Sequence, residues 1–345
     1  MRLSPARQIA FGVLRRVSRG GFASDLLRRQ SAAARDLALA ESIVLGCLRF
    51  QSQLDFLIAH YSGKSKLEDE VRIALRMGIY QLRYLDRIPA HAAVAESVEL
   101  VKRAGKRSAA GLVNAVLRKV NRDPVQWPDR AAALAIPAWM LQRWSKFYGA
   151  TAAENIALAA LEEPAAHFNA DTGRQQDIGA QSVVPYLQIA PGMIALDLCA
   201  APGNKTAQML AAGARVIACD VSPRRMQGVP GERVVLDATA PLPFSIRFDR
   251  ILVDAPCSGT GTLARNPEIK WRLKPEDLPV FQSRQRRILE RALERLKPGG
   301  RLVYSTCSLE REENEEVVAQ FRPRETYARL PGQHPGDGFF IAVIN

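Results

Sequence analysis

Long apolar runs are missing from this 345-residue sequence. No hydrophobic stretch approaches the roughly 20 residues that a membrane-spanning helix needs. The N-terminal segment is interrupted by Arg7, Arg15 and Arg16, whereas the central part of a secretory signal peptide is apolar and uncharged. These absences predict a soluble cytoplasmic protein with no membrane partner.

Cysteine and histidine are scarce and scattered. The five cysteines form no C-x-x-C pair, and their odd number suits a reducing compartment better than a disulfide framework. The four histidines stand at no spacing typical of a zinc site, so we expect no metal. The cysteines therefore serve packing or chemistry, and they are Cys47, Cys199, Cys219, Cys257 and Cys307.

Acidic residues are under-represented in the first third of the chain. Residues 1–125 contain 22 Lys and Arg against 11 Asp and Glu, a net charge of +11, whereas residues 126–345 contain 26 against 24, a net charge of +2. Arginine dominates the basic residues of the first segment, and its planar guanidinium suits phosphate contacts. The excess charge indicates either a solvated helical surface or a module that binds nucleic acid.

The spacing of apolar residues changes along the chain. Residues 1–125 repeat an apolar face at helical spacing, with Gly and Pro between the repeats, which predicts an all-α domain. Residues 126–174 continue as a helical connector, whose tryptophans we expect to pack and not to bind bases. Residues 175–345 alternate short β-type runs with helices, a pattern typical of a parallel sheet flanked by helices.

A turn of small residues follows the first β-type run of the α/β region. The stretch LDLCAAPGNKT contains neither G-x-G-x-x-G nor a phosphate-binding loop, and its small residues let a ligand approach the backbone. The next two runs end in Asp220 and Asp237, placed to bind ribose hydroxyls and an adenine edge. We interpret the three features as a site for S-adenosylmethionine, the alternative being an ordinary turn with solvated aspartates. The predicted cofactor residues are Cys199, Ala200, Ala201, Pro202, Gly203, Asn204, Lys205, Asp220 and Asp237.

Two later β-type runs end in cysteines, and here the sequence resembles a known family. The motifs are CAAPGNKT, DAPCSGTGTLARNPEIKW, YSTCSLEREENEE and GDGFFIAVI. They resemble the RNA (cytosine-5) methyltransferases, and more closely the bacterial Sun/RsmB family, which methylates a cytosine of 16S ribosomal RNA. The stretches MGIYQLRYLDRIPAHAAVAESVELVKR and GLVNAVLRKVNRD resemble that family's N-terminal domain, which is similar to the antitermination factor NusB.

The resemblance implies a fold and its partners. The implied fold is an all-α NusB-like domain followed by an α/β Rossmann-like, S-adenosylmethionine-dependent methyltransferase domain. The implied partner is 16S ribosomal RNA of the small-subunit precursor, and we expect a monomer. Two alternatives stay open: a non-catalytic RNA-binding or ribosome-assembly factor on a degenerate scaffold, and an enzyme that methylates transfer RNA.

The resemblance also implies catalytic roles. Cys307 is the nucleophile that adds to cytosine C6, which makes C5 reactive toward a methyl group, and Cys257 assists release of the product. Asp254 would bond the N3/N4 edge of the base and would also border the cofactor as a cofactor-binding residue. Lys205 would hold charge in the site. DNA cytosine-5 methyltransferases suggest a rival assignment, because their Pro-Cys nucleophile corresponds to Cys257; the STCS and RNPEIKW stretches favour the RNA enzymes.

The sequence departs from the family pattern in several places. Asn204 replaces the second glycine of the usual C-A-A-P-G-G-K-T turn, where we expect positive φ. The segment between Asp220 and Asp237 is shorter than the family's helix, and residues before the turn leave little room for an RNA-recognition subdomain. The acidic run after Cys307 is interpreted as negative charge in the first turn of a helix. Lys270, with its neighbours Arg265 and Asn266, either contacts RNA or packs the loop.

Overall fold

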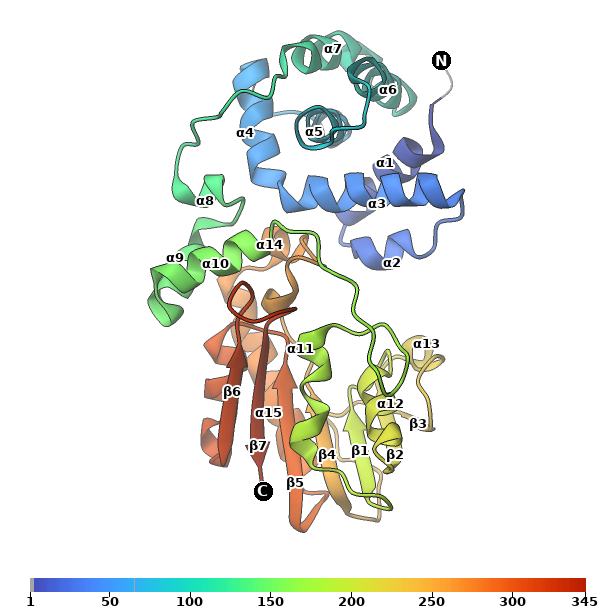
Figure 1. The fold of residues 1–345 in the computed structure, drawn as a ribbon, viewed down its shortest axis with the longest axis vertical. Coiled ribbons are helices and arrows are strands. Elements are labelled where there is room, and N and C mark those ends of the chain that lie inside the picture. The colour runs from blue at the N-terminus through green and yellow to red at the C-terminus, as the bar shows by residue number, and fades with distance from the viewer. Residues whose placement is uncertain (1–2, 65) are drawn as a thin grey trace. The chain divides into compact units, whose positions relative to one another are not determined.

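The computed structural model describes residues 3–64 and 66–345, and its internal contacts divide the chain into two units (Figure 1). The first unit contains the helices of the predicted connector, and it also includes a short stretch of the α/β sequence. These units end at other residues than the domain boundaries predicted at residues 125 and 174. Those domain boundaries stay predictions. The units are Met1–Glu162 with Ala264–Trp271, and Glu163–Leu263 with Arg272–Asn345.

The first unit is built from helices, as its apolar periodicity predicts. Pro5 supplies a helix start, and Gly63, with φ of +66°, ends a helix in the left-handed conformation that glycine favours. The helices are α1 (Pro5–Val17), α2 (Ala23–Leu27), α3 (Ala34–Arg49), α4 (Gln51–Ser62), α5 (Asp69–Tyr84), α6 (Ala90–Arg103), α7 (Ala110–Lys119), α8 (Arg130–Ala133), α9 (Ala138–Tyr148), α10 (Ala150–Ala159) and, apart from its last residue, α14 (Ile269–Arg272).

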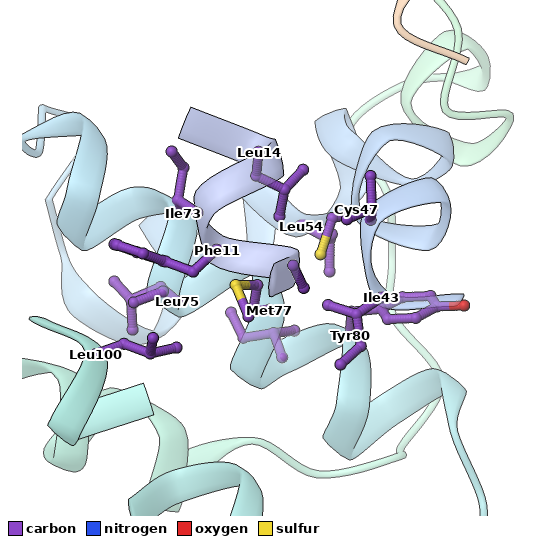
Figure 2. Packing of buried hydrophobic residues seen from close by; sticks show 14 of the residues in the cluster. Phe11, Leu14, Ile43, Cys47, Leu54, Ile73, Leu75, Met77, Tyr80 and Leu100 are labelled. Carbon is purple, nitrogen blue, oxygen red and sulfur yellow. The ribbon is translucent and has the colours of Figure 1, made fainter. Parts of the chain in front are cut away.

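The core of this unit forms where the apolar faces of these helices meet (Figure 2). α3 and α5 approach closely at Gly46, where a Cβ atom would lie 1.9 Å from the Tyr80 ring. Only glycine fits there without moving the aromatic ring. Trp144 of α9 is completely buried, in agreement with its predicted packing role.

The second unit contains a seven-stranded sheet in the order β3-β2-β1-β4-β5-β7-β6. All neighbouring pairs from β3 to β5 are parallel, and β7 pairs antiparallel with both of its neighbours. The α/β fold is therefore confirmed, although the apolar pattern did not predict β6, whose residues ETYAR include no apolar run. The strands are β1 (Ile194–Leu198), β2 (Arg215–Asp220), β3 (Glu232–Val235), β4 (Phe248–Asp254), β5 (Leu296–Thr306), β6 (Glu325–Arg329) and β7 (Phe339–Ile344).

Helices cover both faces of this sheet, because its central strands are apolar on both sides. In β4, Ile251 and Val253 pack with one cluster that includes Ile288 of α15, while Leu252 packs with the opposite cluster that includes Met209 of α12. The helices of this unit are α11 (Ile178–Gln181), α12 (Asn204–Ala211), α13 (Pro223–Met226), α15 (Leu278–Leu293) and α16 (Glu315–Val318).

The parallel strands bring their carboxyl ends to one edge of the sheet, where ligands of open α/β folds bind. The short segment after Asp220 holds only the four-residue α13. Among the described residues, no helix is long and apolar enough to cross a membrane. The same part of the chain gathers no group of three or more His, Cys, Asp or Glu side chains fit to hold a metal ion.

Candidate active site

A cavity of about 600 Å³ opens at the carboxyl ends of the parallel strands in the second unit. Seven of the sequence-predicted residues line it together. They are Cys199, Ala201, Asp220, Asp237, Asp254, Cys257 and Cys307. The predicted cofactor residues that do not line it are Ala200, Pro202, Gly203, Asn204 and Lys205.

The small-residue turn joins β1 to α12 at the cavity wall. Gly203 has φ of +95°, and a Cβ on it would lie 2.9 Å from the Cα of Val229. Asn204 is the first residue of α12 and is not among the residues with positive φ, so the expectation that it requires this conformation is wrong. Its Nδ2 instead donates to the carbonyl oxygen of Gln175 at 3.1 Å. The one strained glycine position of the turn is Gly203.

Asp220 ends β2 and is 5% exposed. Its Oδ2 accepts from the backbone N–H of Ala201 at 3.2 Å, and its Oδ1 accepts from that of Ser222 at 2.9 Å. Arg225 lies 4.0 Å from the carboxylate. Because each carboxylate oxygen can accept more than one hydrogen bond, Asp220 keeps acceptor capacity for ligand hydroxyls on the cavity side.

Asp237 follows β3 on an exposed part of the cavity wall. Its Oδ1 accepts from the backbone N–H of Thr239 at 2.9 Å and from the Thr239 hydroxyl at 2.8 Å. These two hydrogen bonds lower the pKa of Asp237, so the carboxylate is ionised at neutral pH. Its Oδ2 is then available as an acceptor.

Lys205 and Asp254 form an ion pair next to the thiols. The Nζ of Lys205 lies 2.6 Å from Oδ2 of Asp254, and the Ser305 hydroxyl donates to Oδ1 at 2.8 Å. The Lys205 side chain is 11% exposed, and its ammonium lies 5.1 Å from the centre of the Phe339 ring. The pair fixes the orientation of the Asp254 carboxylate at the end of β4.

The two thiols predicted to act together are in contact. Sγ of Cys257 lies 3.4 Å from Sγ of Cys307, although 50 residues separate them in the chain. Their hydrogen bond and burial raise the pKa of the Cys257 thiol well above its usual range. Cys257 therefore stays protonated at neutral pH and can donate its S–H to Cys307.

The cavity also contains side chains that sequence reasoning missed. Arg284 and Arg287 line it from α15, and both lower the pKa of Asp237 in addition to the larger effect of Thr239. They are three residues apart in α15, so helical spacing places them on one face. The sequence could not say that this face meets the cavity. The other missed lining residues are Cys219, Val221, Arg225, Leu236, Ala238, Thr239, Ala255, Pro256 and Ile288.

Lys270 packs inside the first unit. It is 1% exposed, and its Nζ donates to the carbonyl oxygens of Arg49 at 2.8 Å and Ala135 at 2.9 Å. The indole of Trp271 donates to the carbonyl oxygen of Leu48 at 2.6 Å. Lys270 thus satisfies the carbonyl group of Arg49 at the end of α3 and that of Ala135 after α8, and of the two interpretations the structure favours loop packing.

Comparison with protein families divides the chain in two. Residues 4–122 match the NusB family, and residues 184–330 match the family described as 16S rRNA methyltransferase RsmB/F. The first match covers the helices from α1 to α7, and the second covers every cavity residue named above.

Individual relatives match nearly the whole chain. The ribosomal RNA small subunit methyltransferase B of Thermus thermophilus is 34% identical, over 99% of this chain and 95% of its own. The protein of the same name from Klebsiella pneumoniae is 31% identical, over 92% and 91%. Among solved structures, PH0851 covers 100% of both chains with a TM-score of 0.81 at 20% identity, which shows the fold. A methyltransferase homologue from Pyrococcus horikoshii covers 64% of this chain and 99% of its own, with a TM-score of 0.53 and 26% identity.

Proposed function

Because the chain belongs to the ribosomal RNA small subunit methyltransferase B family, we propose that it methylates C5 of a cytosine in 16S ribosomal RNA through a covalent bond from Cys307 to C6. It is an RNA (cytosine-5) methyltransferase, and S-adenosylmethionine is its methyl donor. The observation that carries the proposed mechanism is the contact between two thiols in the cavity that Asp220 also lines.

The cavity residues fit S-adenosylmethionine by their chemistry. Asp220 and Asp237 offer carboxylate oxygens for ribose hydroxyls and an adenine edge, and the turn before α12 has the small side chains that let a ligand approach the backbone. The bound cofactor supplies an electrophilic methyl group. Asp220 and Asp237 hold it, and the thiol side of the cavity receives the base.

Cys307 is the nucleophile in this mechanism. Its partner Cys257 has a raised pKa and keeps its proton, so the Cys257 S–H can donate to the Cys307 sulfur 3.4 Å away. Addition of the Cys307 thiolate to C6 moves the electrons of the C5–C6 double bond toward C5, which would then take the methyl group while S-adenosylhomocysteine leaves with the electrons of the broken sulfur–methyl bond. Loss of the C5 proton and expulsion of the thiolate restore the aromatic ring and free the enzyme.

Asp254 and Cys257 assist different steps of this reaction. Asp254, oriented by Lys205 and Ser305, binds the N3/N4 edge of the cytosine and stabilises the adduct. Cys257 acts after methyl transfer, when the C5 proton leaves and the Cys307 sulfur must depart. The two cysteines therefore perform different steps, although they touch.

Single substitutions of the two thiols test the mechanism. Cys307→Ala cannot form the adduct and should be inactive, whereas Cys257→Ala should attack and methylate but accumulate a protein–RNA complex that survives denaturing electrophoresis. The double variant should form no complex, and Cys47→Ala, in the core of the helical unit, should behave as the wild type. An adduct in Cys307→Ala and none in Cys257→Ala would make Cys257 the nucleophile.

A separate assay decides the substrate. Bisulfite sequencing of RNA from a deletion strain should lose one methylated cytosine in 16S ribosomal RNA. Loss from transfer RNA alone would replace the proposed substrate. A wild type that forms neither methylated product nor adduct on any RNA would leave the non-catalytic assembly factor as the function.

A further inference from the structure

We propose that Glu313 is a positioning residue that ties together the two loops carrying Cys257 and Cys307 and thereby sets the contact between their sulfur atoms. The consequence for catalysis rests on the roles proposed above for the two cysteines. The structural claim concerns thiol geometry and can be tested without RNA.

Glu313 lies in a 3-10 helix, Arg311–Glu313, and is completely buried. Its Oε1 accepts from the backbone N–H of Ser258 at 2.8 Å, and its Oε2 accepts from the hydroxyls of Ser258 and Ser308, the latter at 2.5 Å. Each of these serines directly follows one of the two cysteines. One carboxylate therefore bridges both thiol-bearing loops.

A third element anchors the bridge. The Nε2 of Gln285, in α15, donates to Oε1 of Glu313 and to the carbonyl oxygen of Pro256, both at 3.0 Å. The Tyr304 hydroxyl donates to the backbone carbonyl of Glu313 at 2.6 Å. Since Gln285 is also completely buried, the loops are tied to the packed core of the unit as well as to one another.

The neighbouring Asn314 locks the second loop in a similar way. Its Oδ1 accepts from the Thr306 hydroxyl at 2.5 Å, and its Nδ2 donates to the carbonyl oxygen of Ser308 at 2.9 Å. These contacts correct the interpretation of the acidic run after Cys307. Glu315 and Glu316 do lie in the first turn of α16, but Glu313 is a buried hydrogen-bond acceptor before that helix.

The arrangement suits an ionised carboxylate, because two N–H groups and two hydroxyls converge on its oxygens. Burial raises the pKa of Glu313, while the hydrogen bonds from Ser258 and Ser308 oppose that rise. The negative charge is also one of the causes that raise the pKa of Cys257. Glu313 thus acts on the geometry of both thiols and on the protonation of one.

Chemical cross-linking measures the geometry. Diamide accepts two electrons and two protons from a pair of thiols and leaves a disulfide, so the rate of forming the Cys257–Cys307 disulfide in the full chain reports their proximity. Glu313→Ala, which removes every side-chain acceptor, should slow this reaction at least about tenfold, since held groups react at high effective concentration. Glu316→Ala, an exposed acid of the same run, should cross-link at the wild-type rate.

Glu313→Gln separates charge from shape. Its amide can accept a hydrogen bond from the Ser258 N–H and donate to the two serine hydroxyls. The cross-linking rate should therefore stay within about threefold of the wild-type rate, the change expected from the loss of one hydrogen bond. Without the negative charge, which is one cause of the raised Cys257 pKa, the pH profile for alkylation of Cys257 should move to lower pH. The other titratable or charged groups around that thiol, unchanged in this variant, are Cys307, Asp254, Tyr304, Arg284 and Arg287.

The outcomes decide the proposal. Wild-type cross-linking in Glu313→Ala, with cofactor binding intact by calorimetry, would overturn it. If Glu313→Ala does not fold, the decision passes to Glu313→Gln, and an unshifted alkylation profile would overturn the role. A wild type that cross-links rapidly yet methylates no RNA would defeat the proposed function and leave the role of Glu313 standing.

Discussion

The two units differ in where they carry polar and charged groups. The helical unit includes the segment of net charge +11, and its buried charged groups include Arg7, which pairs with Glu96 at 2.7 Å. The α/β unit is almost neutral by composition, but Asp197, Glu310 and Glu313 are completely buried in it. Positive charge on a surface attracts a polyanion over long distances, whereas buried polar groups create a fixed electric field at one site. The contrast is the one expected if the helical unit binds RNA and the α/β unit carries the chemistry.

The largest effect that would test this contrast is expected at Asp254. Asp254→Asn removes the charge that pairs with Lys205, and methylation should fall roughly 10³-fold, the loss expected when a preorganised electrostatic contact is removed. RNA affinity should stay unchanged. The comparison variant is Asp249→Asn, which breaks the half-exposed pair with Lys297 near the start of the same strand and should keep its activity. Equal methylation rates in both variants would contradict the role of Asp254.

Asp197 tests the buried side of the contrast through pH. Burial raises its pKa to about 7, above its unfolded value, so the folded state binds this proton more tightly. The stabilisation of the folded state by this tighter proton binding is fully present below the unfolded pKa of about 4. It is lost as the pH rises through the folded pKa of about 7. Asp197→Asn should therefore be more stable than the wild type at pH 8 by about 2–4 kcal/mol, and the difference should vanish near pH 4.

Hydrogen exchange of the β1 amides as a function of urea measures this local free energy, because it follows one unit of a two-unit chain. The amides of α5, in the helical unit, serve as the internal control and should show no difference between the two proteins. Parallel pH dependences for wild type and variant at β1 would mean that Asp197 titrates as an ordinary carboxyl.

A smaller effect is expected at Asp220. Asp220→Ala should weaken S-adenosylmethionine binding about ten- to a hundredfold, since a charge-assisted hydrogen bond contributes roughly 1.5–3 kcal/mol. Calorimetry measures this directly, with circular dichroism as the check that the fold persists. The exposed Glu232→Ala, in the neighbouring strand β3, is the control. A dissociation constant equal to that of the wild type would show that Asp220 does not bind the cofactor.

The smallest effect concerns the surface of the helical unit. Lys102 and Arg107 are exposed beside the end of α6, and changing both to Gln should weaken RNA binding about tenfold and reduce the salt slope by about two. Cofactor affinity should not change. The same double change at Arg322 and Arg324, in the α/β unit, should leave the slope nearly as it was. Equal salt slopes for both double variants would show that the RNA contacts lie outside this part of the helical unit.

The sequence alone was informative wherever a short segment carries its own signal. Helical periodicity before residue 125 and β-type runs after residue 175 predicted the two fold classes, and residues at strand ends predicted Asp220, Cys257 and Cys307 as neighbours. The pattern failed for β6, because a partly exposed edge strand needs no apolar run. It also misjudged Asn204, because the positive φ falls one residue earlier, at Gly203.

Amino-acid sequence by itself determined which groups this protein has for chemistry and on which kind of element each one stands, because periodicity, turns and cysteine positions are local properties. Only the tertiary structure decided how close those groups come. Residues of distant segments meet according to strand order and packing, so no local sequence pattern predicts which of them will touch. Examples are the 3.4 Å contact of the thiols, the burial of Glu313 between their loops and the position of Arg284 at the cavity. The same holds for Lys270, whose charge suggested RNA but whose ammonium is enclosed by carbonyl groups of the helical unit.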